Sequence, residues 1–205
     1  MIKPKIKTDF PVAYESNDHI NPKGTVNDNT KNEAYVRELI SRKGVDLKYM
    51  DLGCAGGGFV SQFLERGTFA VGIEGSDLNK KTKRAEWAVW PDYLFTADIT
   101  KPFSVLDEQD QEIKFDVISA FDVMEHISKE QLPGLLTNVN KQLNISGLFV
   151  VSIATFPDEG YHVTLEEKPW WSEKFAEFGL NETQTLRQFG RWSSICAVYE
   201  KVREL

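Results

Sequence analysis

Cysteine is scarce in this sequence, and it contains neither a long apolar run nor an excess of basic residues. Two cysteines among 205 residues are too few for a disulfide framework. No stretch approaches the roughly 18 apolar residues of a membrane-spanning helix, and the basic start is not followed by the apolar segment of a secretion signal. We therefore expect a cytoplasmic protein that does not enter a membrane.

The charge balance is acidic. The chain carries 24 basic and 31 acidic residues, which gives a formal net charge of -7. We do not expect nucleic acid as a partner, because the average field of such a molecule repels a polyanion. The densest basic cluster, at residues 80–84, is interpreted as the solvated face of a helix. A small-molecule or glycan substrate is favoured, and the sequence does not indicate the oligomeric state.

Apolar segments of strand and helix type alternate along most of the chain. Length and composition favour one compact domain over residues 29–205, preceded by a polar arm or lid over residues 1–28. Asn29 or Thr30 is expected to cap the first helix, which Gly44 ends. Helices are expected near 59–67, 80–89, 129–143 and 170–178. Strands are expected at 47–52, 69–73, 93–96, 115–120 and 147–153, with a final hairpin at 183–189 and 193–202. The alternation predicts an α/β fold with a mostly parallel sheet of seven strands that ends in an antiparallel hairpin.

A glycine-rich turn follows the first predicted strand of the sheet. The segment reads Asp-Leu-Gly-Cys-Ala-Gly-Gly-Gly over residues 51–58. Glycine lets a backbone turn tightly and approach a ligand closely. The acidic Asp51 before the first glycine suits a cationic ligand better than a phosphate. The segment resembles the D-x-G-x-G-x-G signature of class I methyltransferases, which depend on S-adenosylmethionine (SAM), with Ala55 in place of the middle glycine.

The resemblance implies a Rossmann-like three-layer sandwich that binds SAM at the carboxyl ends of its strands. Glu74 ends the next strand at the distance where Rossmann-type sites hold a ribose diol. Asp98 and Ile99 match the positions at which this class holds the adenine. The predicted cofactor-binding residues are Asp51, Gly53, Ala55, Gly57, Glu74, Gly75, Asp98, Ile99 and Phe121.

A second group of polar residues follows the strand at 115–120. If the chain turns helical there, Asp122, Glu125 and His126 share one helix face, and His162 can return to the same edge of the sheet. The set is similar to the E-x-x-E-H motif with a distal histidine of small-RNA 2′-O-methyltransferases and ubiquinone-pathway O-methyltransferases. That resemblance implies a divalent metal, Mg²⁺ or Mn²⁺, held by these four residues. In the alternative interpretation, Glu125-His126 is the motif of metal-free relatives.

These features predict a SAM-dependent methyltransferase that methylates a hydroxyl group on a small molecule or a sugar or glycan intermediate. His162, His126 and Glu125 are the predicted catalytic residues, because imidazole titrates near neutral pH. Three alternatives are a nicotinamide (NAD(P))-dependent oxidoreductase or epimerase, an RNA 2′-O-methyltransferase and a SAM-binding regulatory module. No Pro-Pro-aromatic motif of DNA base methylation follows residue 120.

Overall fold

The computed structural model describes residues 2–13, 28–158, 161–184, 186 and 194–205. Its elements, with η marking 3₁₀ turns, are β1 (Lys5–Thr8), α1 (Glu33–Lys43), β2 (Lys48–Leu52), α2 (Gly58–Leu64), β3 (Phe69–Glu74), α3 (Leu78–Thr82), η1 (Ala85–Ala88), β4 (Leu94–Thr96), β5 (Phe103–Leu106), β6 (Phe115–Phe121), η2 (Met124–His126), α4 (Leu132–Gln142), β7 (Leu143–Ala154), α5 (Lys168–Glu177), β8 (Leu180–Thr183) and β9 (Ser194–Lys201). Among the described residues, no helix has both the length and the apolar character that crossing a membrane requires.

Seven strands form one sheet in the order β4-β3-β2-β6-β7-β9-β8. The first five in this order are parallel neighbours, and β9 pairs antiparallel with both β7 and β8. The order reverses between β2 and β6, where open α/β sheets bind ligands at the carboxyl ends of their strands. This is the predicted α/β Rossmann-like fold with its C-terminal antiparallel hairpin.

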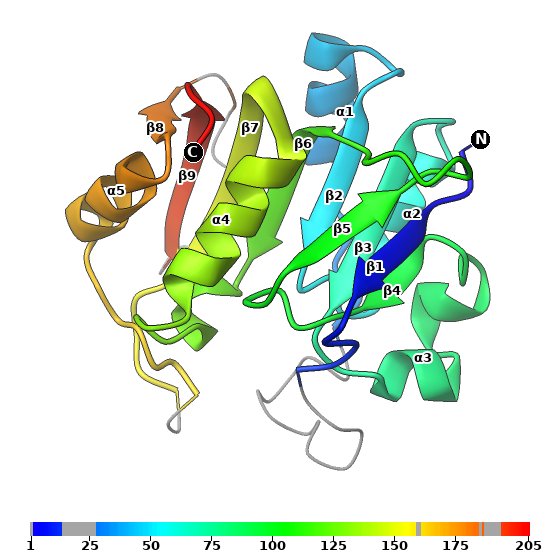
Figure 1. Ribbon diagram of the computed structural model, residues 1–205, viewed down its shortest axis with the longest axis horizontal. Helices are drawn as coiled ribbons and strands as arrows, with labels where there is room; N and C mark the ends of the chain where they lie inside the picture. The colour runs from blue at the N-terminus through cyan, green and yellow to red at the C-terminus, as the bar shows by residue number, and fades with distance from the viewer. Residues whose placement is uncertain (1, 14–27, 159–160, 185, 187–193) are drawn as a thin grey trace.

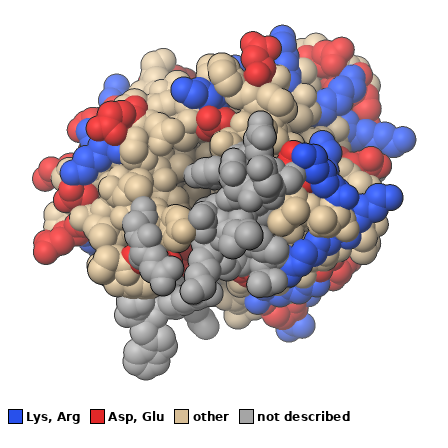
Figure 2. Space-filling model, turned by 90° about the horizontal axis from the view of Figure 1, so that it is seen from below, with Lys and Arg blue, Asp and Glu red and all other residues tan. Residues whose placement is uncertain are grey.

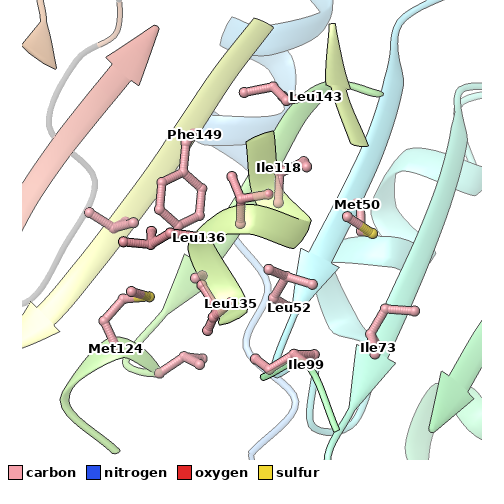
Figure 3. Packing of buried hydrophobic residues seen from close by; sticks show 14 of the residues in the cluster. Met50, Leu52, Ile73, Ile99, Ile118, Met124, Leu135, Leu136, Leu143 and Phe149 are labelled. Carbon is pink, nitrogen blue, oxygen red and sulfur yellow. The ribbon is translucent and has the colours of Figure 1, made fainter. Parts of the chain in front are cut away.

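Helices cover both faces of the sheet (Figure 1). One face packs against α4, α5 and the small β1–β5 sheet, and the other packs against α1 and α2. Alternation along the strands divides the side chains between the two faces. Met50 and Leu52 of β2 join the α4 side, whereas Tyr49 joins the α1 side. Figure 3 shows Leu135 and Leu136 of α4 reaching toward β2, β6 and β7.

The first helix begins later than predicted. Asn32, rather than Asn29 or Thr30, is its N-cap, and its side chain accepts a hydrogen bond from the amide of Tyr35. Gly44 ends the helix with a φ of 91°, as glycine permits. Asn29 and Thr30 are therefore left in the segment that runs past the glycine-rich turn.

The helix predicted over 80–89 is wrong as a single element. The chain forms α3 and then η1, with a positive φ at Lys83, which ends α3, and at Ala85, which begins η1. This break lets the buried Trp87 donate its indole N–H to the carbonyl of Ala55 at 2.8 Å. A tertiary hydrogen bond therefore overrides the local helix pattern.

Two other predicted elements have different bounds. The helix predicted over 129–143 begins at Leu132, with a proline in its first turn, and Leu143 already belongs to β7. The strand predicted over 183–189 lies at 180–183, and Gln184 and Leu186 lie outside it. Residues 187–189 are outside the described part of the chain.

The two-stranded sheet of β1 and β5 was not predicted. Its strands pair antiparallel, with Ile6 opposite Val105. Val105 is buried and Ile6 packs against the same core cluster. The strand β1 near the start of the chain therefore packs against the core through Ile6.

Candidate functional site

A cavity of about 210 Å³ opens at the carboxyl ends of β2, β6 and β7, on the side of the sheet that α1 covers. Figure 2 shows the molecule from below, the side toward which these strands run in Figure 1. The residues lining this cavity, called the tip cavity below, are Asp28, Thr30, Asn32, Asp51, Gly53, Cys54, Ala55, Phe59, Phe121, Asp122 and Ser152. None of these is basic, and three are acidic. The lining therefore favours a cation over a phosphate.

Asp51 is the most deeply buried acid of the tip cavity, with 4% of its surface exposed. Ser119 donates a hydrogen bond to its Oδ1 at 2.6 Å, and the hydroxyl of Tyr49 lies 2.5 Å from that of Ser119. Burial nevertheless raises the pKa of Asp51 to about 7, while these hydrogen bonds oppose the rise. The ligand-free carboxyl group is therefore close to half ionised near neutral pH.

The small residues of the glycine-rich turn differ in their backbone conformations and in their neighbours. Gly53 has a φ of 70°, and a Cβ there would lie 2.4 Å from a methyl group of Val123. Gly57 has a φ of 88° and precedes α2, where a Cβ would contact Leu94 at 2.8 Å. Ala55 takes a left-handed φ of 45° although it is not glycine. The turn is thus shaped by its neighbours as well as by access to a ligand.

Glu74 fixes the conformation at Ala55. Its carboxylate accepts a hydrogen bond from the amide of Ala55 at 2.8 Å and one from Ser76 at 3.2 Å. Glu74 is 5% exposed, and burial raises its pKa despite these donors. Neither Glu74 nor Gly75 lines the tip cavity, so the predicted ribose position lies beside it.

Asp98 and Ile99 follow β4 and also lie outside the lining of the tip cavity. The Asp98 Oδ1 atom accepts hydrogen bonds from the amide of Thr100 at 2.9 Å and from its hydroxyl at 2.6 Å. Ile99 is 8% exposed. Asp51 lies near the carboxyl end of β2, Glu74 ends β3 and Asp98 follows β4. Because these strands are parallel neighbours, the three acids lie toward the same edge of the sheet.

Glu125, His126 and His162 form a second group of polar side chains, called the Glu125 cluster below. One ligand atom from each lies within 4.8 Å of the others. Residues 161–164 reach this place because the amide of Val163 donates to the carbonyl of Glu125 at 2.8 Å. The two imidazole rings meet edge to face, with centroids 4.9 Å apart. The structure thus brings together three of the four predicted metal ligands.

Each member of the Glu125 cluster keeps one atom for a ligand. Glu125 is fully buried, and its Oε1 accepts from the amide of Ala154 at 2.9 Å, whereas its Oε2 has no hydrogen-bond partner among the described residues. Burial raises the pKa of Glu125 to about 7. His126 Nδ1 lies 3.0 Å from the carbonyl of Tyr161, and His162 Nδ1 lies 2.6 Å from that of Phe156. A carbonyl only accepts hydrogen bonds, so each Nδ1 carries a proton and donates it. In the neutral rings, Nε2 keeps its lone pair.

Asp122 does not join the Glu125 cluster. The chain forms the short 3₁₀ turn η2 instead of the helix that the prediction assumed, and Asp122 precedes it with a left-handed φ of 53°. Its Oδ1 accepts a hydrogen bond from Ser152 at 2.7 Å, and its residue lines the tip cavity. Asp122 therefore belongs to the tip cavity. It is close in sequence to Glu125, and its charge acts on the Glu125 carboxyl group.

Several residues of the tip cavity were missed by the sequence analysis. Asp28, Thr30 and Asn32 come from the segment before α1, and Ser152 comes from β7. Only the abundance of Asx residues near position 28 hinted at a structured segment. Ser119 supports Asp51 from the adjacent strand, a contact that depends on the β2–β6 register.

A family model described as a methyltransferase domain matches residues 27–194. No match to the chain was found among curated protein sequences.

Solved structures with the same fold include several methyltransferases. A TehB-like SAM-dependent methyltransferase from Corynebacterium glutamicum is 19% identical, with a TM-score of 0.59, and the match covers 81% of this chain and 86% of that one. The magnesium protoporphyrin IX methyltransferase of Synechocystis, with bound S-adenosylhomocysteine (SAH), is 15% identical, with a TM-score of 0.61 and coverage of 91% and 97%. A Burkholderia thailandensis N1-methyltransferase, bound to 1,6-didemethyltoxoflavin and SAH, is 16% identical, with a TM-score of 0.58 and coverage of 83% and 78%.

Proposed function

The chain belongs to the methyltransferase-domain family, and we propose that this SAM-dependent methyltransferase methylates a hydroxyl group on a small molecule or a sugar or glycan intermediate. The observation that carries the choice of a hydroxyl acceptor is the Glu125 cluster, which gathers a buried carboxyl group and two imidazoles near the tip cavity. Family membership favours the methyltransferase over the nicotinamide-dependent alternative.

In this proposal SAM occupies the tip cavity and extends along the strand ends. Asp51 faces the cationic amino-acid part of the cofactor, Gly53, Ala55 and Gly57 shape the turn around it, and Phe121 packs against it. Glu74 and Gly75 serve the ribose, while Asp98 and Ile99 serve the adenine. The acidic lining supports this orientation, because SAM carries a sulfonium and an ammonium group.

Methylation of a hydroxyl group requires help with its proton, because an alcohol is a poor nucleophile near neutral pH. Glu125 has a pKa of about 7, which suits exchange of a proton at its Oε2 atom. Burial lowers the pKa of His126, so its ring is neutral near pH 7. The Nε2 atom of His126 can therefore accept the proton of an acceptor hydroxyl held beside it, and the His162 ring lies next to it. Holding that hydroxyl in line with the sulfonium methyl supplies much of the remaining catalysis.

The Glu125 cluster also fits a divalent cation such as Mg²⁺ or Mn²⁺. Glu125 Oε2 is buried and has no hydrogen-bond partner in the part of the chain that the structure describes, and both imidazoles are oriented by carbonyl groups in the manner typical of metal ligands. The three ligands would be Glu125, His126 and His162. A bound divalent ion would supply positive charge that favours loss of the hydroxyl proton. Mixed carboxylate and imidazole donors suit Mn²⁺ better than Mg²⁺.

The acceptor is proposed to be small or glycan-like rather than RNA. The formal net charge of -7 and the acidic lining of the tip cavity both oppose a polyanion. The fold alone leaves the acceptor atom open, because structural neighbours include N-, O- and carbon methyltransferases. The proposal therefore rests on the side chains of the Glu125 cluster.

Variants of the Glu125 cluster test the proposal. We expect Glu125→Gln and His162→Ala to lower SAH formation with hydroxyl acceptors by at least about a hundredfold, the usual size of a general acid–base contribution. The affinity for SAH, measured by calorimetry, should stay within about twofold. Mn²⁺ binding, measured by electron paramagnetic resonance, should weaken in the same two variants.

Asp158→Asn is the control, because this half-buried acid lies near His126 but outside the Glu125 cluster. It should retain Mn²⁺ binding and most of the turnover. Unchanged turnover in His162→Ala would contradict the hydroxyl proposal, and unchanged Mn²⁺ binding in both cluster variants would exclude the metal from this place.

A further inference from the structure

Residues 28–32 run from the N-terminal segment to α1 and lie against the glycine-rich turn. We propose that Asp28 is a cofactor-binding residue whose carboxylate binds the ammonium group of the cofactor, and that Gly56 and Gly58 are glycines because residues 28–30 dock there. This inference rests on the proposed placement of SAM in the tip cavity. It is independent of the acceptor and of the Glu125 cluster.

The backbone of residues 28–30 lies where side chains would be at two glycines. The amide of Gly56 donates to the carbonyl of Asp28 at 3.0 Å, and a Cβ on Gly56 would lie 2.7 Å from that oxygen. A Cβ on Gly58 would lie 2.3 Å from the carbonyl oxygen of Thr30. Gly56 and Gly58 thus differ from Gly53, where the obstacle is Val123. Two glycines of the motif make room for another part of the chain.

Side chains hold the same segment at several points. Asn29 Nδ2 donates to Glu86 Oε1 at 3.1 Å, and Lys31 forms an ion pair with Glu86 at 2.8 Å. The amide of Asn32 donates to Gln62 Oε1 at 2.8 Å. Glu86 is tied to the turn in its own right, because its amide donates to the carbonyl of Gly56 at 3.0 Å. Residues 28–32 are therefore a fixed wall of the tip cavity.

Asp28 places a second carboxylate beside Asp51 in this cavity. Both residues line it, and the charge of Asp28 contributes to the raised pKa of Asp51, although desolvation is the main cause. The hydroxyl of Thr30 donates to Asp28 Oδ1 at 2.5 Å, which orients the carboxylate. Two neighbouring carboxylates, with no basic side chain among the described lining residues, suit a ligand with a positive charge and several N–H donors. The ammonium group of SAM has both properties.

Residues 10–13 lie at the same edge of the sheet, on the side proposed for the nucleoside. The amide of Asp98 donates to the carbonyl of Phe10 at 3.0 Å, and the amide of Ala13 donates to the carbonyl of Gly75 at 2.7 Å. Residues 10–13 thus contact two positions proposed for the adenosine, while Asp28, Thr30 and Asn32 line the amino-acid side. Residues 10–13 and residues 28–32 therefore both belong to the rim of the proposed cofactor site.

Two ligands separate binding of the ammonium group from a purely structural role. SAH carries the ammonium group, whereas 5′-methylthioadenosine lacks the amino-acid part but keeps the adenosine. In calorimetry with the full chain, we expect Asp28→Asn to weaken SAH binding about tenfold to a hundredfold, the usual range for a charge-assisted hydrogen bond. Binding of 5′-methylthioadenosine should stay within about twofold. Asp46→Asn removes an exposed acid elsewhere and should change neither affinity.

A second variant tests the docking itself. Gly58→Ala places a methyl group against the carbonyl of Thr30, so we expect the same selective loss of SAH affinity with an unchanged circular dichroism spectrum. Equal weakening of both ligands by Asp28→Asn, or unchanged SAH binding in that variant, would overturn the role of Asp28. Normal SAH binding by Gly58→Ala would overturn the docking argument. Failure of the unmodified protein to bind SAH would instead contradict the cofactor itself.

Discussion

The pKa of Asp51 predicts that cofactor affinity depends on pH. Burial raises this pKa to about 7 in the ligand-free protein, and the proposed contact with a cationic cofactor requires the ionised carboxylate. The ionised fraction is about a tenth at pH ~6 and about three quarters at pH ~7.5. Since the apparent Kd equals the intrinsic Kd divided by the binding-competent fraction, we expect SAH to bind about eightfold more weakly at the lower pH.

The assay is calorimetric titration of SAH at several pH values in buffers of matched ionic strength. The amino group of the ligand also titrates, above neutral pH, so the profile of Asp51→Asn is the reference that lacks the contribution of Asp51. Ser119→Ala provides a second check. It removes the hydrogen bond that lowers the pKa of Asp51, so the pH dependence should move to higher pH. Identical pH profiles for the unmodified protein and Asp51→Asn would refute the assignment of this carboxylate to the cofactor.

Two further predictions concern stability. Gly134→Ala places a Cβ 2.1 Å from the carbonyl oxygen of Thr100, so we expect a loss of about 1–3 kcal/mol in unfolding free energy by urea denaturation; unchanged stability would mean that α4 can shift away at no cost. Lys201→Met removes a fully buried ammonium group that donates to the carbonyls of Asn140 and Leu143 at 2.7 and 2.8 Å, and the loss should be about 1–3 kcal/mol for each carbonyl left unpaired. Lys5→Met, at an exposed ion pair, should leave the stability within about 0.5 kcal/mol, and an equal effect of the two lysine variants would contradict the role of burial.

Periodicity and the glycine-rich motif were sufficient to predict most of the sheet. The strands β2, β3 and β6 are short apolar segments, and the longer β7 is mostly apolar in its buried second part; helices separate these strands, and local patterns identify them well. The β1–β5 sheet was missed because a four-residue strand gives a weak signal, although Ile6 alternates with Lys5 and Lys7. Its partner lies about a hundred residues away, and no local pattern specifies that pairing.

The site was harder to predict where it depends on unusual backbone conformations. Asp122 was expected on the same helix face as Glu125, but its left-handed φ turns it toward Ser152 and the tip cavity. Asp28 was assigned to the polar arm. Its place at the site could not be predicted, because it depends on the space left by Gly56 and Gly58. A sequence pattern identifies the glycines, but the neighbour that requires them is known only from the fold.

The most direct test of the hydroxyl-methyltransferase account is a crystal structure of the full chain with SAH and Mn²⁺, with anomalous data that locate the ion. The account predicts SAH in the tip cavity with its ammonium group between Asp28 and Asp51, and one anomalous peak within bonding distance of Glu125, His126 and His162. A peak bound instead by Asp122, or SAH bound elsewhere on the sheet edge, would contradict the account.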